Sequence, residues 1–359
     1  MLKKVIVFMG FLYMGFGFAG TTHHEVNADD SKSLNASTNH LLYPIEQKGK
    51  FGFINSNGEV IVEPIYENLV YPGLASTTYY IVDHTNNKQV YYNSAGNKLF
   101  ECLKNKCGPL YEGRALFMDE SRTPDGTRVT RYGYLNEQGE VAIKPIYHKA
   151  FNFSEGLARV NQGKASGFIN TKGELVIPYR YSETFDFSEG KAVVKLSAKG
   201  KYGYIDTSGK MVISPQFDYA KQFSEDTAVV SVNGKYGYIN SKGDYLLKPQ
   251  FTNAQPFSEG LAFVERNGAS FYINKKGEKI IQFIKAGGTF SGGLAPASRG
   301  RTYGFIDKSG FFVIKPQFEW ADSFYGDLAK VYLHTAISED YIEGYIDRRG
   351  NILWPPKQR

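Results

Sequence analysis

Short apolar stretches alternate with glycine-containing polar turns along most of this chain, and that pattern predicts strands joined by tight turns. Residues 228–232 read Ala-Val-Val-Ser-Val, the pair Asn233-Gly234 follows, and another apolar stretch begins at Tyr236. An Asn-Gly pair between two such stretches is a strong short signal of a β-hairpin. Tyr and Phe, which favour strands, number 26 each, so composition agrees with an all-β chain.

The strands belong to a repeat with a period of about 34 residues. Tyr202-Gly203-Tyr204-Ile205-Asp206 recurs as Tyr236-Gly237-Tyr238-Ile239-Asn240 and as Tyr303-Gly304-Phe305-Ile306-Asp307. Each of about nine copies has Asn or Asp, two further residues and then Gly. This spacing predicts a type I turn closed by a left-handed residue. The turns of the nine copies begin at Asn55, Asn93, Asn136, Asn170, Asp206, Asn240, Asn274, Asp307 and Asp347.

Two further elements complete the unit. A Pro-x-Phe/Tyr segment, such as Pro215-Gln216-Phe217, follows each turn, and because proline cannot donate to a ladder the strand must end or lie at an edge there. A Phe-Ser-Glu-Gly motif then starts the next strand, as at Phe153 and Phe257. We therefore expect a three-stranded meander that shares its core with neighbouring copies. Since a WD40 blade needs four strands and more residues, an open curved or superhelical array is favoured over a closed propeller.

The fullest copies, residues 200–206 and 234–240, read Gly-Lys-Tyr-Gly-Tyr-Ile-Asp/Asn, and this resembles the WG repeat family, also called KWG repeats. The resemblance covers roughly residues 43–354 and places a repeat domain at 41–359. One departure is that no Trp-Gly pair occurs in this chain. The resemblance implies a β-rich repeat with a binding or scaffold role, and it implies no catalytic residues.

The first residues predict export. Lys3 and Lys4 precede an apolar run from Val5 to Ala19, which is typical of a signal peptide spanning residues 1–19. The run is short for a bilayer span, although an uncleaved anchor is the alternative. Residues 20–40 are polar without periodicity and predict a disordered linker. We expect a secreted, periplasmic or cell-surface protein of the envelope, with no stable membrane insertion after cleavage.

Cys102 and Cys107 are the two cysteines. A close pair in an exported chain predicts a disulfide, with free thiols as the alternative.

Candidate chemistry is sparse. The net charge of +6 is spread along the chain without a basic run, which argues against a nucleic-acid partner. We find no Gly-x-Ser-x-Gly, Walker loop or zinc spacing, so we expect no catalytic, metal-binding or cofactor-binding residues. The repeated Ser-Glu pair is interpreted as architecture, because an enzyme needs one site. The acidic pairs Asp119-Glu120 and Glu339-Asp340 keep open a carboxylate hydrolase on a propeller-like ring.

The leading prediction is an exported binding scaffold for protein or glycan ligands, with a structural or adhesive spacer as a further alternative. In repeat proteins the positions that vary between fixed anchors line the binding surface. The candidates follow the Pro-x-Phe/Tyr segment and are expected in equivalent places, with Trp320 as the best anchor. They are His148, Glu183, Tyr219, Asn253 and Trp320. The insertions around 76–88, 119–130 and 334–343 are a second candidate face.

Overall fold

The computed structural model describes residues 41–66, 68–70, 78–83, 88–93, 95–103, 106–282, 284–334 and 341–355. The predicted signal peptide and linker lie outside these residues. Within the described part, no helix is long and apolar enough to span a membrane. The described residues form nine antiparallel sheets.

Each sheet is built from consecutive strands in chain order. The first three sheets contain β1 (Tyr43–Gln47), β2 (Lys50–Ile54) and β3 (Val60–Tyr66); β4 (Asn68–Val70), β5 (Thr78–Asp83), β6 (Lys88–Asn93) and β7 (Lys98–Leu103); and β8 (Cys107–Tyr111), β9 (Arg114–Arg122), β10 (Arg128–Leu135) and β11 (Val141–Tyr147). The next three contain β12 (Lys149–Ser154), β13 (Leu157–Gln162), β14 (Ala165–Asn170) and β15 (Leu175–Tyr181); β16 (Glu183–Thr184), β17 (Lys191–Lys195), β18 (Tyr202–Asp206) and β19 (Met211–Phe217); and β20 (Tyr219–Ser224), β21 (Thr227–Val232), β22 (Lys235–Asn240) and β23 (Tyr245–Phe251). The last three contain β24 (Asn253–Ala254), β25 (Ala262–Arg266), β26 (Ala269–Ile273) and β27 (Lys279–Ile281); β28 (Ala286–Gly287), β29 (Ala295–Ser298), β30 (Tyr303–Ile306) and β31 (Phe312–Phe318); and β32 (Trp320–Ala321), β33 (Ala329–His334), β34 (Tyr341–Ile346) and β35 (Ile352–Trp354).

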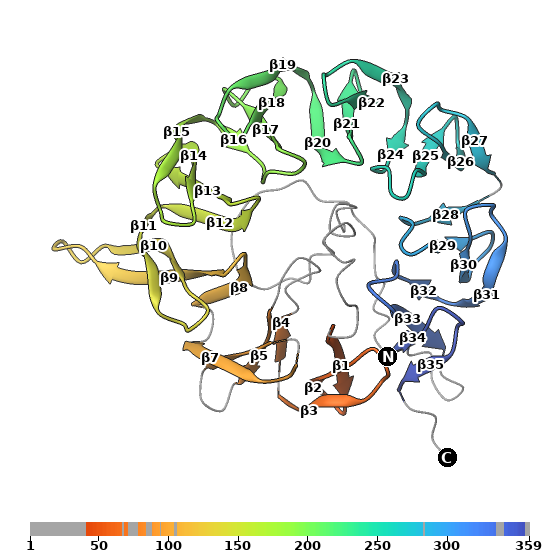
Figure 1. The fold of residues 1–359 in the computed structure, drawn as a ribbon, viewed down its shortest axis with the longest axis horizontal. Helices are drawn as coiled ribbons and strands as arrows, with labels where there is room; N and C mark the ends of the chain where they lie inside the picture. The colour runs from red at the N-terminus through yellow and green to blue at the C-terminus, as the bar shows by residue number, and fades with distance from the viewer. Residues whose placement is uncertain are drawn as a thin grey trace, which may run out of the picture.

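The all-β repeat array is confirmed, but its unit is a four-stranded meander rather than the three-stranded one expected. Eight of the nine sheets have four strands, and the first has three. In each complete sheet the first strand lies innermost and the fourth lies outermost (Figure 1). The extra strand is the innermost one. It escapes sequence reading because it can be only two residues long, as in β16 and β24, or be broken by a register shift, as between Ala220 and Phe223.

The nine predicted turns, each between the last two strands of its sheet, are confirmed. In the copy at Asp206, the carboxylate oxygen Oδ1 accepts the backbone N–H groups of Ser208 and Lys210 at 3.0 Å each. Gly209 closes the turn at φ 82°, in the left-handed region where glycine has no Cβ clash. The equivalent Asn or Asp side chain makes the same pair of bonds in all the other copies.

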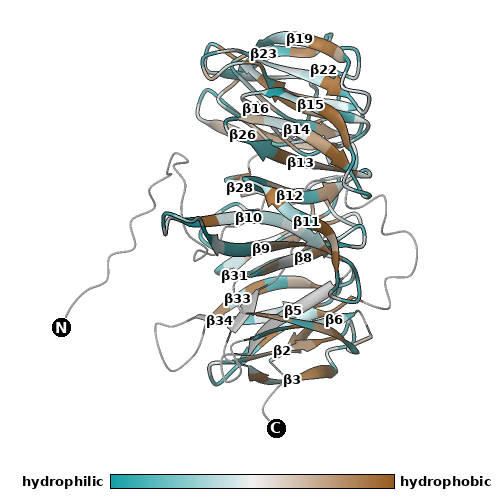
Figure 2. Cartoon of the chain, turned by 90° about the vertical axis from the view of Figure 1, so that its left-hand side faces the viewer, coloured by the Kyte–Doolittle hydropathy of each residue, from teal (hydrophilic) through white to brown (hydrophobic). Residues whose placement is uncertain are grey.

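The hydrophobic core lies between neighbouring sheets, as expected for units that cannot bury a core alone. Tyr204, Ile213 and Phe217 of one sheet pack against a cluster from the next, including Phe223 and Val230, and all five are nearly inaccessible. Similar clusters recur along the array. In the side view, hydrophobic and hydrophilic stretches alternate along the strands (Figure 2).

The recurrent glycine of the third strand is required by a close backbone approach. A Cβ built on Gly203 would lie 2.5 Å from the Ile213 carbonyl oxygen and 2.8 Å from the Pro215 nitrogen. A register shift between Tyr202 and Tyr204 marks the bulge that brings β19 so near. Pro215 lies in this outermost strand, consistent with the edge position predicted for it.

The two ends of the array meet. Tyr43 of β1 donates a hydrogen bond from its hydroxyl to the Tyr325 carbonyl at 3.0 Å, and its ring contacts those of Tyr325 and Tyr345 edge-on. Ile54 and Trp354 belong to the same buried cluster. The array therefore curves into a ring-shaped arrangement whose first and last sheets are in contact (Figure 1).

Candidate binding surface on the innermost strands

Four of the five predicted binding residues occupy one equivalent position. Glu183, Tyr219, Asn253 and Trp320 are each the first residue of an innermost strand. Each pairs with the second strand of its sheet in the same register, Tyr219 with Ser231 and Trp320 with Tyr332 for example. The structure thus places them as a row around one rim of the ring.

His148 does not belong to this row, and its predicted equivalence is wrong. The register pairs Lys149, not His148, with Asn161 at the matching position. The sequence spacing was counted one residue short after Tyr147. The His148 ring nitrogen Nδ1 instead accepts a hydrogen bond from the Gly163 N–H at 3.2 Å, and Gln162 Oε1 lies 3.1 Å from the same nitrogen. His148 therefore stabilises the turn between β13 and β14 of its own sheet.

Trp320 joins two sheets while remaining partly open to solvent. Its ring centroid lies 4.9 Å from that of Tyr303 in the preceding sheet, and its indole N–H donates to Asp322 Oδ1 at 2.9 Å. The residue is nevertheless 45% exposed. Trp320 therefore packs between repeats and is also exposed to solvent.

Further tyrosines extend the row. Tyr219, 40% exposed, meets Tyr236 edge-on at 6.0 Å between ring centroids. The Tyr202 hydroxyl donates to Glu183 Oε2 at 2.8 Å. Burial raises the pKa of Tyr202, and Glu183 and nearby Tyr219 raise it further. Tyr202 is therefore hydrogen-bonded to one of the predicted residues, Glu183.

At the other end of the row, Tyr332 donates its hydroxyl proton to Glu343 Oε1 at 2.9 Å, and Lys330 Nζ lies 2.7 Å from the other carboxylate oxygen. Burial is the main cause that raises the pKa of Tyr332, with Glu343 adding to it. We call the following six residues the aromatic row: Tyr202, Tyr219, Tyr236, Tyr303, Trp320 and Tyr332. Sequence reasoning missed four of them, although Tyr202, Tyr236 and Tyr303 are the first tyrosine of the repeated Tyr-Gly-Tyr/Phe motif.

The repeated Ser-Glu pair is architectural, as interpreted from its recurrence. Ser188 Oγ donates to the Phe223 carbonyl of the next sheet at 2.7 Å, and Glu189 accepts the Asp226 N–H at 2.7 Å. Glu189 itself has φ 51°, a left-handed conformation that costs a non-glycine residue about 1 kcal/mol. The bond to the neighbouring sheet offsets that cost. Equivalent inter-sheet bonds occur at Ser154, Glu155, Ser224, Glu225, Ser258 and Glu259.

The second tyrosine of the Tyr-Gly-Tyr motif makes another inter-sheet bond. The buried Tyr204 hydroxyl donates to the Lys221 carbonyl of the next sheet at 2.8 Å, and Tyr238 does the same to Gln255 at 2.7 Å. Burial raises the pKa of both tyrosines. These hydroxyls hold sheets together and are not available for chemistry.

One polar contact between neighbouring sheets involves Arg159 and Asp186. Arg159 lies at a position held by Val193 or Val229 in later copies, and its guanidinium sits 3.5 Å from the centroid of the Phe151 ring. Its Nε is 3.5 Å from Asp186 Oδ1. Desolvation raises the pKa of Asp186, and the Arg159 charge opposes that shift. The pair bridges two neighbouring sheets.

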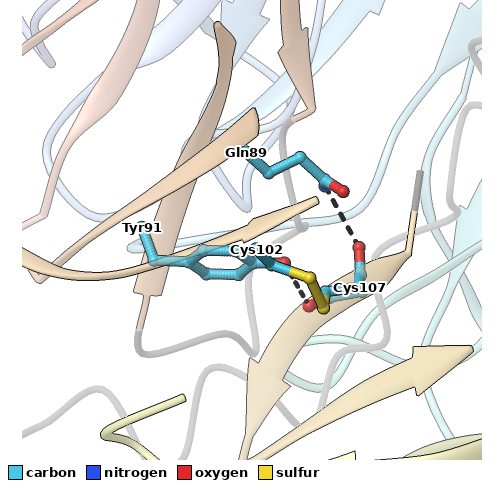
Figure 3. The surroundings of a disulfide bond; sticks show 5 residues. Gln89, Tyr91, Cys102 and Cys107 are labelled. Carbon is cyan, nitrogen blue, oxygen red and sulfur yellow. Dashed lines mark hydrogen bonds between the residues drawn. A yellow bond between two sulfur atoms is a disulfide. The ribbon is translucent and has the colours of Figure 1, made fainter. Parts of the chain in front are cut away.

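The structure contains the predicted disulfide between Cys102 and Cys107. It joins the outermost strand β7 of one sheet to the innermost strand β8 of the next. Beside it, Gln89 donates to the Cys107 carbonyl at 3.1 Å, and the Tyr91 hydroxyl donates to the Gly108 carbonyl at 2.9 Å (Figure 3). The bond therefore reinforces a sheet-to-sheet connection.

Among the described residues, no group of three or more His, Cys, Asp or Glu side chains is placed to hold a metal ion. Asp119 and Glu120 are successive residues of β9 and point to opposite faces of it, so they do not form a facing pair of carboxylates. Glu339 and Asp340 lie outside the described residues.

These features define a β-repeat protein with a propeller-like arrangement, whose sheets are bonded in series and whose rim carries aromatic side chains. The chain belongs to the WG containing repeat family, whose model matches residues 51–72, 132–164, 167–199, 202–236, 236–268 and 303–333, together more than half of the chain. The resemblance seen in the sequence is thereby confirmed.

No curated protein matches the chain. Several solved structures are similar at low sequence identity. Hsv2 of Kluyveromyces lactis is 10% identical, with 76% of this chain and 94% of that chain covered and a TM-score of 0.33. A quinonprotein alcohol dehydrogenase-like protein of Bacteroides thetaiotaomicron is 10% identical, with 89% and 76% covered and a TM-score of 0.34. Virginiamycin B lyase from Staphylococcus aureus is 13% identical, with 69% and 96% covered and a TM-score of 0.29. Such low scores support no inference about function.

Proposed function

We propose that this protein is an exported, non-catalytic scaffold that binds a protein or glycan ligand through the aromatic row. The observation that carries the proposal is the exposure of two large aromatic side chains at equivalent positions, 45% for Trp320 and 40% for Tyr219. Tyr and Trp supply large contact areas at low cost in side-chain entropy, since each has two rotatable angles.

The surroundings of these side chains favour binding. Trp320 is held by Tyr303 and Asp322, and Tyr219 lies against Tyr236, so little ordering remains to oppose association. Glu183 and Asn253, at equivalent positions, add polar groups that can orient a ligand. Because the array repeats, an extended ligand can contact several sheets at once and gain avidity.

Export and the disulfide belong to the same proposal. The basic and apolar segments at residues 1–19 predict secretion, and a disulfide persists in an oxidising compartment. We place the scaffold outside the cytoplasm, where both protein and glycan partners are accessible.

The test is a glycan array and a pull-down with residues 41–359, followed by Trp320→Ala and Tyr219→Ala on whichever partner is captured. Each substitution should weaken binding at least about tenfold if its side chain is an anchor. Phe311→Ala is the matched control, since Phe311 is 73% exposed and lies in a turn outside the row. A captured partner that binds both variants like the unmodified chain would refute the aromatic row as the binding surface.

A further inference from the structure

The hairpin formed by β9 and β10 projects from the ring (Figure 1). The outer strand β11 pairs with β10 only as far as Tyr132, and β8 pairs with β9 only as far as Phe117. Beyond these points the register continues to the pair of Arg122 and Arg128, and residues 119–128 are all exposed. A two-stranded ribbon exposed to water is only marginally stable, because it buries no core of its own. Folding stability therefore does not explain why the hairpin extends this far.

Charges at the tip of this ribbon oppose its pairing. Arg122 lies directly opposite Arg128, and like charges facing each other across two strands are destabilising. Glu120 lies on the same face two residues away, where Lys106 Nζ lies 2.8 Å from its carboxylate and the Arg128 charge contributes less than Lys106 to lowering its pKa. On the other face the pair of Asp119 and Arg131 is complementary. The repulsion is thus confined to one face.

The tip is pre-shaped around these two arginines. Arg122 Nη1 donates to the Gly126 carbonyl at 3.1 Å, and the turn is closed by Asp125, whose carboxylate accepts the Thr127 N–H at 3.1 Å. A shallow hollow lined by Glu120, Ser121, Arg122 and Arg128 lies here. A guanidinium offers two parallel N–H donors to an oxyanion, and a second guanidinium across the ribbon offers two more.

We propose that the ribbon tip is a binding site for a tetrahedral oxyanion, a phosphate or sulfate group, held between Arg122 and Arg128. Four oxygens suit two guanidinium forks, whereas one carboxylate has two oxygens and suits one fork. The bound charge removes the repulsion between the arginines and offsets the cost of ordering the ribbon. This site is separate from the aromatic row.

The experiment titrates sodium phosphate, and separately sodium sulfate, into the full chain at constant ionic strength set with sodium chloride. The arginine Nε–Hε signals of Arg122 and Arg128 are followed by NMR. Saturable shifts in either titration support the site, and comparison of the two affinities tells phosphate from sulfate. Shifts that never saturate, or that sodium acetate reproduces at the same concentrations, overturn it.

Three variants make the test specific. Arg122→Gln and Arg128→Gln should each weaken the affinity for the anion at least about tenfold. Each variant lacks one guanidinium donor pair, and its arginine pair no longer repels, so the anion gains nothing by neutralising it. Arg131→Gln, on the opposite face, should change it less than about twofold. Equal losses in all three variants would mean nonspecific attraction to positive charge. Trp320→Ala should leave anion binding unchanged, so failure here and failure of the aromatic row are distinguishable.

Discussion

Gly203→Ala tests the close approach of β18 and β19 that defines the unit. The added Cβ would sit 2.5 Å from the Ile213 carbonyl oxygen and 3.0 Å from Pro215 Cα. Ordinary contact begins near 3.4 Å, so the two backbones would have to separate by about 0.9 Å at a bulge whose bonds leave little slack. The contacted atoms belong to the backbone, and no side-chain rotation can relieve the clash.

Overpacking of this kind costs roughly 1–3 kcal/mol, and the loss of the adjoining ladder bond costs about 1 kcal/mol more. We therefore expect Gly203→Ala to lower the free energy of unfolding by about 3 kcal/mol. The measurement is the midpoint of urea unfolding, followed by far-ultraviolet circular dichroism. Because a repeat array can open one unit at a time, hydrogen exchange should show the largest loss of protection in β18 and β19.

Two glycine substitutions separate the clash from other effects of alanine. Gly300→Ala meets nothing within 4 Å and lies outside the left-handed region, so its effect should stay within about 0.5 kcal/mol. Gly234→Ala also meets nothing but has φ 72°, and should cost about 1 kcal/mol from backbone strain alone. If Gly203→Ala were no more destabilising than Gly300→Ala, the interpretation of the bulge would be refuted.

Three further predictions concern bonds that hold the array. Tyr204→Phe should lower the free energy of unfolding by about 1 kcal/mol, because the Lys221 carbonyl loses its hydrogen-bond donor. Tyr245→Phe, at an exposed position, is the control. Equal urea midpoints for the two variants would contradict the inter-sheet bond. Replacing Cys102 and Cys107 together by serine should cost about 2 kcal/mol by the loop-entropy model, and a urea midpoint equal to that of the unmodified chain would contradict it. The Ser208 hydroxyl and the backbone N–H groups of Ser208 and Lys210 lower the pKa of Asp206 below its ordinary 3.8, so its contribution to stability is full above that value and lost as pH falls through the folded pKa. Asp206→Asn, the residue of most other copies, should therefore flatten the acid side of the unfolding profile between pH 7 and pH 2, and an unaltered profile would count against this cap.

The turns within each repeat were predictable from the sequence, whereas the innermost strand and its pairing were not. The turn at Asp206 could be predicted because its hydrogen bonds and its glycine all lie within five consecutive residues, 206–210. The innermost strand was missed because β16 spans two residues and carries no alternation of its own. Its pairing with β17 depends on the turn between them, which the sequence presents only as a Ser-Glu-Gly motif.

The misplacement of His148 has a different origin. Tyr219 and Trp320 each lie two residues after the aromatic residue of the Pro-x-Phe/Tyr segment, and the same count from Tyr147 leads to Lys149, which pairs with Asn161. A shift of one residue moves a side chain to the other face of a strand, so this count decides which side chain joins the row. Glu183 and Trp320 were placed correctly because each lies two residues after the aromatic residue that ends the preceding strand.

The bonds between sheets explain which positions of the repeat are fixed and which are free to bind. Ser188, Glu189 and Tyr204 each reach a backbone group of the following sheet, so a change at any of them weakens a contact that every neighbour repeats. The first residue of the innermost strand varies instead, and it is Lys149, Glu183, Tyr219, Asn253, Ala286 or Trp320 in successive copies. Since lysine, alanine and asparagine also occupy this position, the fold does not require an aromatic side chain there. Two large aromatic residues are exposed at a position that alanine and asparagine can also occupy. This exposure favours a role for them in contact with a ligand.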